Sequence, residues 1–265
     1  MYSRWQLAKK YFHYYTTASN GKGHGVHSPF VFDFIINVLN DGKTYEAYGQ
    51  VEGLRSRLLR DNTLLTVEDF GAGSAISNTR QRSVASIAKN AAKSKKLGQL
   101  LHRIVRYYQP ATMLELGTSL GVSSAYMALG NPAAKLVTGE GSSAVAAQAT
   151  ANFKQLGLAG VQLVPGNFDE TLPGMLRELR TVGLAFLDGN HRLEPTLHYF
   201  QQLQPYLTAY SIVIVDDIHW SEGMEQAWEQ IKENPAVTLT IDLFFIGLVF
   251  FRKDFKVKQH FVVRY

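Results

Sequence analysis

The sequence predicts an α/β fold in which a mostly parallel sheet ends in an antiparallel hairpin and a helical extension precedes it. From Leu97 onward, short apolar runs alternate with helical patterns at the spacing of βαβ units, which implies parallel strands with right-handed crossovers. One such run, residues 113–116, bends through two glycines into a helical pattern. Near the C-terminus, the apolar runs 237–244 and 247–251 have only a short break between them, so we expect them to pair antiparallel.

The first 96 residues are expected to form a helical extension or lid. Residues 3–18 predict an amphipathic helix, and residues 20–29, with three glycines and a proline, predict a loop. Two more helices are expected at 30–39 and 45–59. The residues at helical spacing in the first helix are Trp5, Ala8, Phe12 and Tyr15. This aromatic content suggests either an apolar lid or a dimer surface.

Residues 97–255 are expected to form the main domain. Its predicted parallel strands are residues 113–116, 136–140, 161–164, 184–187 and 212–215. Its predicted helices are residues 97–108, 122–129, 143–156, 170–179, 194–207 and 221–232. The tail, residues 256–265, is β-prone, and we expect it to cover the edge of the sheet or a neighbouring subunit.

The glycine turn between the first strand and its helix is a candidate ligand site. In an open α/β sheet, nucleotide-like ligands bind at this junction, where glycines allow close approach and the helix start offers N–H donors. The spacing is G-x-x-x-G from Gly117 to Gly121, preceded by Glu115. A dinucleotide-binding fingerprint requires G-x-G-x-x-G, and Ser119 and Val122 occupy its second and third glycine positions.

A carboxylate for a ribose is expected at the end of the next strand, about 20 residues further on. Glu140 lies 140 − 121 = 19 residues after Gly121 and closes an apolar run. Residues 68–74 also combine an acid with G-x-G, but 19 residues after Gly73 the chain reaches Ala92, in a basic helical run at 82–96. We therefore interpret residues 69–74 as a turn before a helix.

The segment ELGTSLGVSS resembles motif I of the class I S-adenosylmethionine (SAM) dependent methyltransferases, and most of all the small-molecule O-methyltransferases related to catechol O-methyltransferase. The segment HGVHSPFVF resembles the start of uncharacterised bacterial methyltransferases. The resemblance implies a seven-stranded Rossmann-like sheet with the C-terminal hairpin. It also implies SAM contacts at Glu115, Gly117, Thr118, Ser119, Gly121, Glu140, Gly166, Asn167, Phe168 and Asp188. Core packing would explain Phe168 equally well.

Acids end two of the later strands. In the catechol O-methyltransferase group, Mg²⁺ is held by an aspartate after one strand and an Asp-Asn pair after the next, so the resemblance implies metal ligands at Asp188, Asp216 and Asp217, with Asp217 in place of the asparagine. His191 stands where that family has a lysine base, and histidine suits proton removal near neutral pH. Many relatives with a D-x-x-H segment use no metal, and acids at strand ends also cap helices, so these alternatives stay open.

Composition and net charge narrow the classes of function that the chain can have. The chain has no cysteine, which excludes disulfides and fits a reducing compartment. Its longest apolar run, residues 243–251, is shorter than the ~20 residues of a membrane span, so we expect a cytoplasmic protein. The net charge is +5, partly from a basic run between Lys89 and Arg106. A solvated helix face accounts for that run, and RNA binding is the alternative.

The sequence therefore predicts a SAM-dependent methyltransferase that acts on a small molecule, with oxygen as the expected acceptor atom. His191 is the candidate base, with Asp188 beside it, and Mg²⁺ is an optional cofactor. His219 and Trp220 are candidates for lining the acceptor site. The alternatives are an RNA methyltransferase and a non-catalytic SAM-binding or interaction protein. A homodimer is possible, and no membrane partner is expected.

Overall fold

The computed structural model describes residues 1–23, 25–68 and 81–265. The chain forms two compact parts. We call residues 42–180 the glycine-turn part, and residues 1–41 with 181–265 the hairpin part. The domain boundaries predicted after residues 96 and 255 were drawn from sequence patterns, whereas these two parts are defined by compactness. The predicted boundaries therefore stay predictions. His24 and the turn predicted at residues 69–74 lie outside the described residues.

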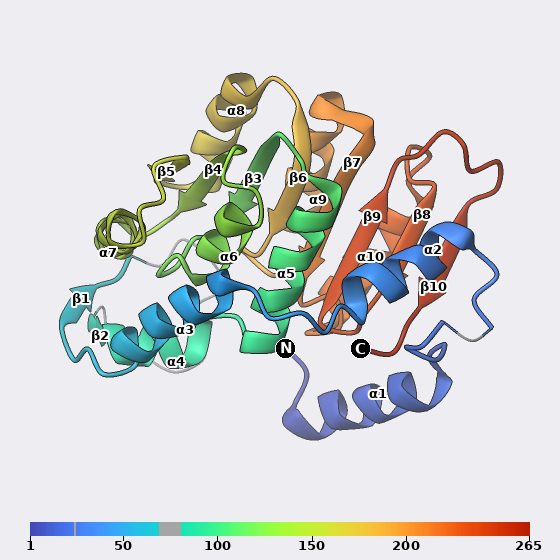
Figure 1. Ribbon diagram of the computed structural model, residues 1–265, viewed down its shortest axis with the longest axis horizontal. Helices are drawn as coiled ribbons and strands as arrows, with labels where there is room; N and C mark the ends of the chain where they lie inside the picture. Colours follow the sequence, from blue (N-terminus) through green and yellow to red (C-terminus); the bar gives the residue numbers. More distant parts are fainter. Residues whose placement is uncertain (24, 69–80) are drawn as a thin grey trace. The chain divides into compact units, whose positions relative to one another are not determined.

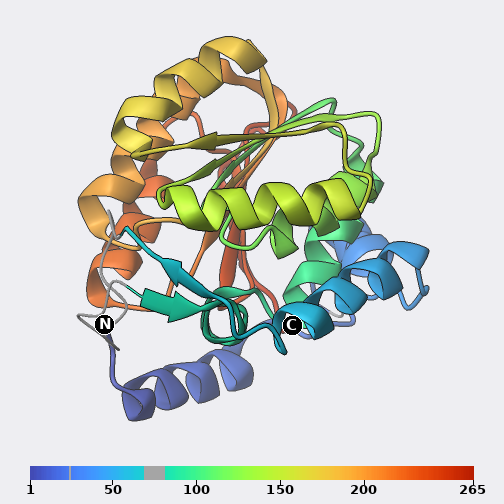
Figure 2. The same cartoon turned by 90° about the vertical axis from the view of Figure 1, so that its left-hand side faces the viewer.

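The glycine-turn part contains three of the predicted parallel strands. They are β3 (Thr112–Leu116), β4 (Lys135–Glu140) and β5 (Val161–Pro165), paired in parallel in that order. Its helices are α3 (Glu46–Leu58), α4 (Val84–Ala91), α5 (Lys95–Tyr108), α6 (Val122–Gly130), α7 (Ser143–Gln155) and α8 (Phe168–Leu179). The predicted alternation of strand and helix is confirmed here. Figure 2 shows α7 beside an additional antiparallel pair, β1 (Leu64–Thr66) and β2 (Gln81–Ser83).

The continuous helical run expected at residues 82–96 is wrong. Residues 81–83 form β2, α4 follows, and the chain breaks before α5. Two serines cause the interruption, because each caps the start of a new helix. The Ser83 hydroxyl accepts from the Ser86 N–H, and the Ser94 hydroxyl accepts from the Leu97 N–H.

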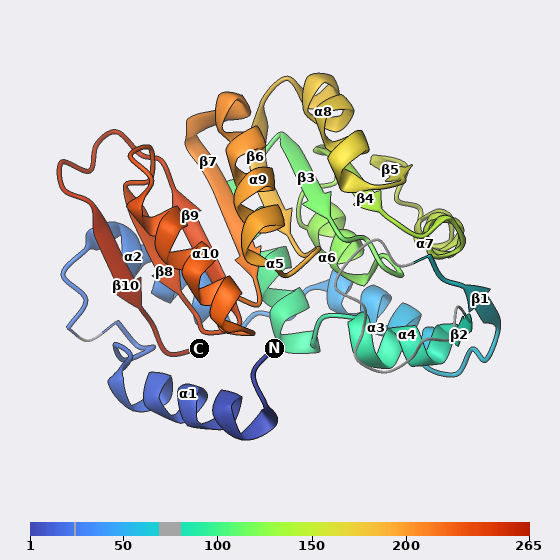
Figure 3. The same cartoon turned by 180° about the vertical axis from the view of Figure 1, so that it is seen from behind.

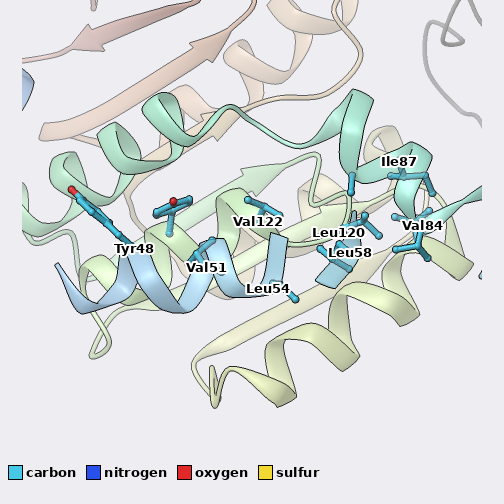
Figure 4. Close-up of a cluster of buried hydrophobic side chains, with 12 residues drawn as sticks. Tyr48, Val51, Leu54, Leu58, Val84, Ile87, Leu120 and Val122 are labelled. Carbon is cyan, nitrogen blue, oxygen red and sulfur yellow. The ribbon is translucent and has the colours of Figure 1, made fainter. Parts of the chain in front are cut away.

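Helix α3 packs directly on α6, the helix that follows the glycine turn. The shared core joins apolar side chains of α3 and α4 to those at the start of α6 (Figure 4). The labelled members are Tyr48, Val51, Leu54, Leu58, Val84, Ile87, Leu120 and Val122. The Tyr126 hydroxyl also donates to Glu52 at 2.7 Å. Helices α3 and α4 of the predicted extension therefore support the candidate ligand site through packing.

The hairpin part contains five strands. They are β6 (Val182–Leu187), β7 (Leu207–Asp216), β8 (Leu239–Asp242), β9 (Ile246–Phe250) and β10 (Gln259–Val262), in the order β10-β8-β9-β7-β6. Strand β9 is antiparallel to both β7 and β8, which confirms the predicted hairpin. Strand β10 pairs in parallel with β8. Among the described residues, the main sheet therefore has eight strands, one more than the seven predicted. The tail covers the edge at β8, which was one of the two expectations for it.

Helices cover both faces of these five strands. The helical segments are α1 (Arg4–Thr17), α2 (Pro29–Phe34), the π-helical η1 (Ile35–Leu39), α9 (Leu193–Leu203), η2 (Gln204–Tyr206) and α10 (Glu222–Glu233). Helix α2 lies over one face (Figure 1), and α9 and α10 lie over the other (Figure 3). The ring of Phe30 in α2 packs edge-on against Phe250 of β9, 5.0 Å between centroids. In residues 1–23, 25–68 and 81–265, no helix is both long and apolar enough to cross a bilayer.

Helix α1 is bonded to the rest of the hairpin part at several points. The Tyr2 N–H donates to the Trp220 carbonyl at 3.0 Å. The Lys10 ammonium lies 3.0 Å from the Glu225 carboxylate, and the Tyr14 hydroxyl donates to the Val263 carbonyl. Within the amphipathic helix predicted from the sequence, Trp5 is 80% exposed and points outward. Ala8, Phe12 and Tyr15 are exposed as well, so the stripe predicted at helical spacing is wrong as the packed side of the helix. The inner side is instead made by Tyr14 and Tyr11, which pack on Phe244.

Candidate functional site

The glycine turn has a backbone that few sequences can adopt. Gly117, Ser119 and Gly121 all have positive φ, at 102°, 48° and 82°. The N–H groups of Gly117 and Thr118 both donate to the Gly139 carbonyl at 3.0 Å, which fastens the turn to the end of β4. A non-glycine residue in the left-handed region costs free energy and tends to occur at functional sites. The left-handed backbone of Ser119 therefore marks this turn as a candidate functional site.

Glu140 lies against the turn, as the residue count predicted. Its two carboxylate oxygens accept from the Ser119 N–H at 2.7 Å and the Ser142 N–H at 3.0 Å. Burial raises the pKa of Glu140, and the backbone N–H groups of Ser142, Ser119 and Gly141 oppose that increase. A carboxylate has about four lone-pair sites, so these oxygens retain capacity for further donors such as sugar hydroxyls. Ser142 was missed in the sequence, where it resembles an ordinary helix cap.

Glu115 and Thr118 are almost fully enclosed. The Glu115 carboxylate accepts from the hydroxyls of Ser123, Ser124 and Thr138, and its side chain is 0% exposed. Burial raises the pKa of Glu115, against the lowering effect of those three hydroxyls. The structure thus places Glu115 beneath the turn, where it holds the start of α6 against β4.

The segment predicted to flank an adenine follows β5. Gly166 has φ 130°, and Asn167 caps α8 by accepting from the Asp169 N–H at 3.2 Å. The Phe168 ring packs over Gly139, because a Cβ added to Gly139 would lie 3.2 Å from that ring. Phe168 is half-buried, next to the residue that precedes Glu140. The structure therefore brings the third predicted segment to the same end of β4 as the turn and Glu140.

Gly121 should not tolerate a side chain. At φ 82°, a Cβ would lie 2.4 Å from the Phe153 ring, so Gly121→Ala is expected to lower the free energy of unfolding by roughly 2–4 kcal/mol through strain and overpacking. Gly157→Ala is the matched control: its φ is 69°, yet among the described residues nothing lies within 4 Å of the added Cβ. Urea unfolding of both variants separates the cost of backbone strain from the cost of overpacking. Equal decreases in the free energy of unfolding would contradict a role for Phe153.

Two acids and a histidine meet in the hairpin part. Asp188 follows β6, Asp216 ends β7, and His191 lies in the loop before α9; one ligand atom from each lies within 4.8 Å of the others. The His191 Nε2 is 3.6 Å from an Asp188 carboxylate oxygen, and Asp216 is buried. Parallel pairing of β6 and β7 brings the two acidic ends together, as the sequence predicted.

The donor set differs from the one predicted for Mg²⁺. Asp188, His191 and Asp216 form the group, whereas Asp217 turns into the wall of a neighbouring cavity. Mg²⁺ prefers oxygen ligands, while an imidazole with two carboxylates suits first-row divalent metals such as Mn²⁺, Fe²⁺ or Zn²⁺. These three residues can hold such a cation, and without one the same contact lets Asp188 orient His191.

His219 has the structural role that is usual for a lone histidine, alongside its predicted place near an acceptor. Its Nδ1 lies 2.9 Å from Glu225 and its Nε2 lies 2.8 Å from Asp242, so both ring nitrogens have carboxylate partners. Burial lowers the pKa of His219, but the hydrogen bonds and charges of Asp242 and Glu225 outweigh it, and the pKa is raised overall. Because Glu225 also binds Lys10 and Tyr2, the imidazole belongs to the network that fixes α1.

The cavity beside Asp217 is walled by aromatic residues. His219 and Trp220, both predicted near an acceptor, line it, whereas Tyr11, Phe244 and Phe245 were not predicted there. Phe244 ends the first of the two C-terminal apolar runs, and Phe245 begins the short break after it. Two adjacent phenylalanines at the edge of a turn are the signal that could have indicated this wall.

Comparison with known proteins agrees with this geometry. The family described as a methyltransferase domain matches residues 114–218, which include the glycine turn, Glu140, Asp188 and Asp216. A comparison with curated proteins finds no match.

Solved methyltransferases share the fold. An O-methyltransferase from Bacillus cereus, solved with S-adenosylhomocysteine, is 18% identical with a TM-score of 0.57, covering 80% of this chain and 93% of its own. TomG, an O-methyltransferase of tomaymycin synthesis from Streptomyces achromogenes, solved with SAM, is 20% identical with a TM-score of 0.57, covering 79% and 91%. The Podospora anserina methyltransferase PaMTH1 is 15% identical with a TM-score of 0.58, covering 96% and 98%.

Residues 114–218 thus match the model of a methyltransferase domain, and the fold is the one found in the solved O-methyltransferases. The predicted fold is confirmed, and the family match agrees with the predicted class of enzyme.

Proposed function

We propose that the protein transfers a methyl group from SAM to a hydroxyl oxygen of a small molecule. The observation that carries the proposal is the hydrogen bond from the Ser119 N–H to Glu140, which joins the glycine turn and the ribose carboxylate in one cluster. The O-methyltransferases with the same fold, from Bacillus cereus and Streptomyces achromogenes, favour oxygen as the acceptor atom.

The glycine-turn part supplies the groups that a SAM site requires. Gly121 is the N-cap of α6 and has no side chain that could cap the helix. The first N–H groups of α6 therefore suit the carboxylate of the methionine moiety of SAM. Glu140 would accept from the ribose hydroxyls, and Phe168 would contact the adenine. Glu115, enclosed beneath the turn, would act by positioning α6 and would add negative charge near a cationic ligand.

The hairpin part supplies the groups that act on the acceptor. SAM provides an electrophilic methyl group, so the protein needs to align the acceptor and remove its proton. His191 would take the proton, with Asp188 orienting its ring. If a divalent cation binds, Asp188, His191 and Asp216 would hold it, and it would favour the deprotonated hydroxyl. A nitrogen of His191 that binds a cation cannot also take the proton of the acceptor. The mechanism with His191 as base and the mechanism with a bound cation therefore exclude each other.

The first test is direct. We expect purified protein to bind SAM and S-adenosylhomocysteine by calorimetry, and mass spectrometry of the denatured protein to detect one of them when it is retained through purification. Absence of binding of both ligands would contradict the proposal.

In the described residues, part of the predicted basic run is committed to packing, which weakens the case for RNA as the acceptor. Arg103, in the middle of the run, is buried, and Arg106 lies over the Tyr45 ring at 4.7 Å. Lys89, Lys95 and Lys96 of the run are exposed, as a solvated helix face requires. The cytoplasmic location and a homodimer stay predictions.

A further inference from the structure

We propose that helix α1 docks the protein on the surface of an anionic lipid bilayer. Its outward side enters the headgroup region with three aromatic rings, and the basic residues beside these rings contact the lipid phosphates. Such a contact needs no membrane-spanning segment, whereas the expectation of no membrane partner rested on the length of the apolar runs. Lipid binding of this kind is independent of the methyl transfer proposed above.

The outward side of α1 carries large apolar side chains that face solvent. Trp5 is 80% exposed, Phe12 70% and Tyr15 47%. Together with Ala8 they recur at the spacing of one helix face, and we call these four residues the aromatic stripe. Single exposed apolar residues are ordinary, but a set on one face marks a surface that binds a partner.

The other side of α1 is already packed within the hairpin part. The rings of Tyr11 and Tyr14 lie 5.0 and 5.2 Å from the ring of Phe244, and the Lys10 ammonium donates to Glu225 at 3.0 Å. Figures 1 and 3 show α1 at the rim of this part, beside the end of β10. The helix cannot turn its aromatic stripe inward without breaking these contacts.

The start of α1 is fixed by its own sequence. The Ser3 hydroxyl accepts from the Gln6 N–H at 3.3 Å, and the Ser3 N–H donates to the Gln6 side chain at 2.8 Å, which is a capping box. Arg4 and Trp5 therefore belong to a formed first turn. A helix that exists before it meets the bilayer avoids the cost of ordering on binding.

Basic residues border the aromatic stripe on both sides. At 3.6 residues per turn, Arg4 lies at one border and Lys9 at the other, and both are exposed. An aromatic centre with basic borders is typical of helices that lie in the membrane interface. The long basic side chains reach the phosphates while the rings enter the boundary of the acyl chains.

Positive charge is concentrated in the segments that form this side of the hairpin part. Residues 1–32 and 255–265 contain seven lysines and arginines and neither aspartate nor glutamate. The rest of the chain has 27 − 7 = 20 basic and 22 acidic residues, so the net charge of +5 comes from these two segments. They meet where Ser19 bridges Val263 and where the Arg264 guanidinium lies over the Tyr15 ring at 4.3 Å.

The nearby acid Glu225 does not reach the aromatic stripe. It binds Lys10, which lies on the side of α1 opposite the stripe by helix geometry. An anionic surface that meets the stripe would therefore contact Arg4 and Lys9 first. Each basic residue near such a surface strengthens the attraction.

Charge also favours a lipid surface over a second copy of the chain. A two-fold contact through the aromatic stripe would bring Arg4 and Lys9 of both copies together, and residues 1–32 offer no acid to pair with them. Tryptophan and tyrosine are enriched at membrane interfaces, where the ring is in an apolar layer and its polar atom stays hydrated. An anionic bilayer provides both the negative charge and the apolar layer.

The test is flotation of the full chain with vesicles that mix phosphatidylglycerol with phosphatidylcholine, and with vesicles of phosphatidylcholine alone. We expect binding to the anionic vesicles, and weaker binding as salt is raised. The double variant Trp5→Gln with Phe12→Gln is expected to bind these vesicles at least about tenfold more weakly, because two rings no longer enter the bilayer. Arg4→Gln with Lys9→Gln is expected to weaken binding roughly tenfold at low salt.

Matched controls change the same residue types elsewhere. Tyr210→Gln removes a ring of β7 that is 80% exposed, as Trp5 is. Lys154→Gln with Arg177→Gln removes an exposed lysine and an exposed arginine from α7 and α8. Both controls should bind the anionic vesicles as the parent does. Circular dichroism of each variant shows that it is folded.

Three results would overturn the proposal. The first is that the parent does not float with anionic vesicles, and the second is that the Trp5→Gln, Phe12→Gln variant floats equally well. The third is a different partner for the aromatic stripe in a protein that binds no vesicles. That partner would be single-stranded RNA if the stripe variants lose binding of an oligonucleotide, or a second copy if they dissociate a dimer in sedimentation.

Discussion

Glu140→Ala is expected to weaken SAM binding by about 100-fold or more. A hydrogen bond to a charged group is worth about 1.5–3 kcal/mol, and the ribose would lose its carboxylate acceptor. The variant also frees the Ser119 and Ser142 N–H groups that Glu140 now binds, so the turn itself would loosen. Calorimetric titration with SAM measures the change.

Two controls make the result interpretable. Glu233→Ala removes an exposed glutamate at the end of α10 and should leave SAM affinity unchanged. Urea unfolding of Glu140→Ala shows whether the variant remains folded at the temperature of the titration. A folded Glu140→Ala protein with the affinity of the parent would move the SAM site away from the glycine turn.

The clustering of the glycine turn with Glu140, where SAM is proposed to bind, could be predicted because its determinants are local. The strand, the G-x-x-x-G turn and the acid 19 residues later belong to consecutive βα units, and parallel pairing of β3 with β4 places Glu140 beside the turn. When two strands are joined by a single crossover, counting residues along the chain is sufficient to predict which side chains lie together at the strand ends. The same logic brought Asp188 and Asp216 together across β6 and β7.

The residues proposed to act on the acceptor depend on contacts between segments that are distant in sequence. Asp217 leaves the acidic group because its backbone turns to bond Phe245, which lies 245 − 217 = 28 residues further along the chain. Tyr11 reaches the same wall through a salt bridge between Lys10 and Glu225, residues 215 positions apart. The β1–β2 pair was missed for a related reason: Gln81–Ser83 has no β-prone apolar residue, and its strand forms only because Leu64–Thr66 lies beside it.

Asp188→Asn is expected to lower kcat by about 100- to 10,000-fold, the range of general acid–base catalysis. The substitution keeps the size of the side chain and removes its charge. Whether Asp188 orients His191 or binds a cation, that charge is needed, so the loss follows from either version. Turnover with SAM of a phenolic acceptor identified by screening, followed by mass spectrometry of the methylated product, is the measurement. Glu194→Gln, an exposed acid in the first turn of α9, is the matched control.

A chelator and a second variant separate the two versions. If His191 acts as the base, activity survives EDTA, and His191→Ala loses turnover while keeping SAM affinity. If Asp188, His191 and Asp216 hold a cation, EDTA abolishes activity, and added Mn²⁺ or Zn²⁺ restores it better than Mg²⁺, since one of the three donors is a nitrogen. An Asp188→Asn protein as active as the parent would remove the acidic group from catalysis, whichever version held before. Full recovery by Mg²⁺ alone would instead favour an all-oxygen ligand set, with Asp217 returned to the position predicted from the sequence.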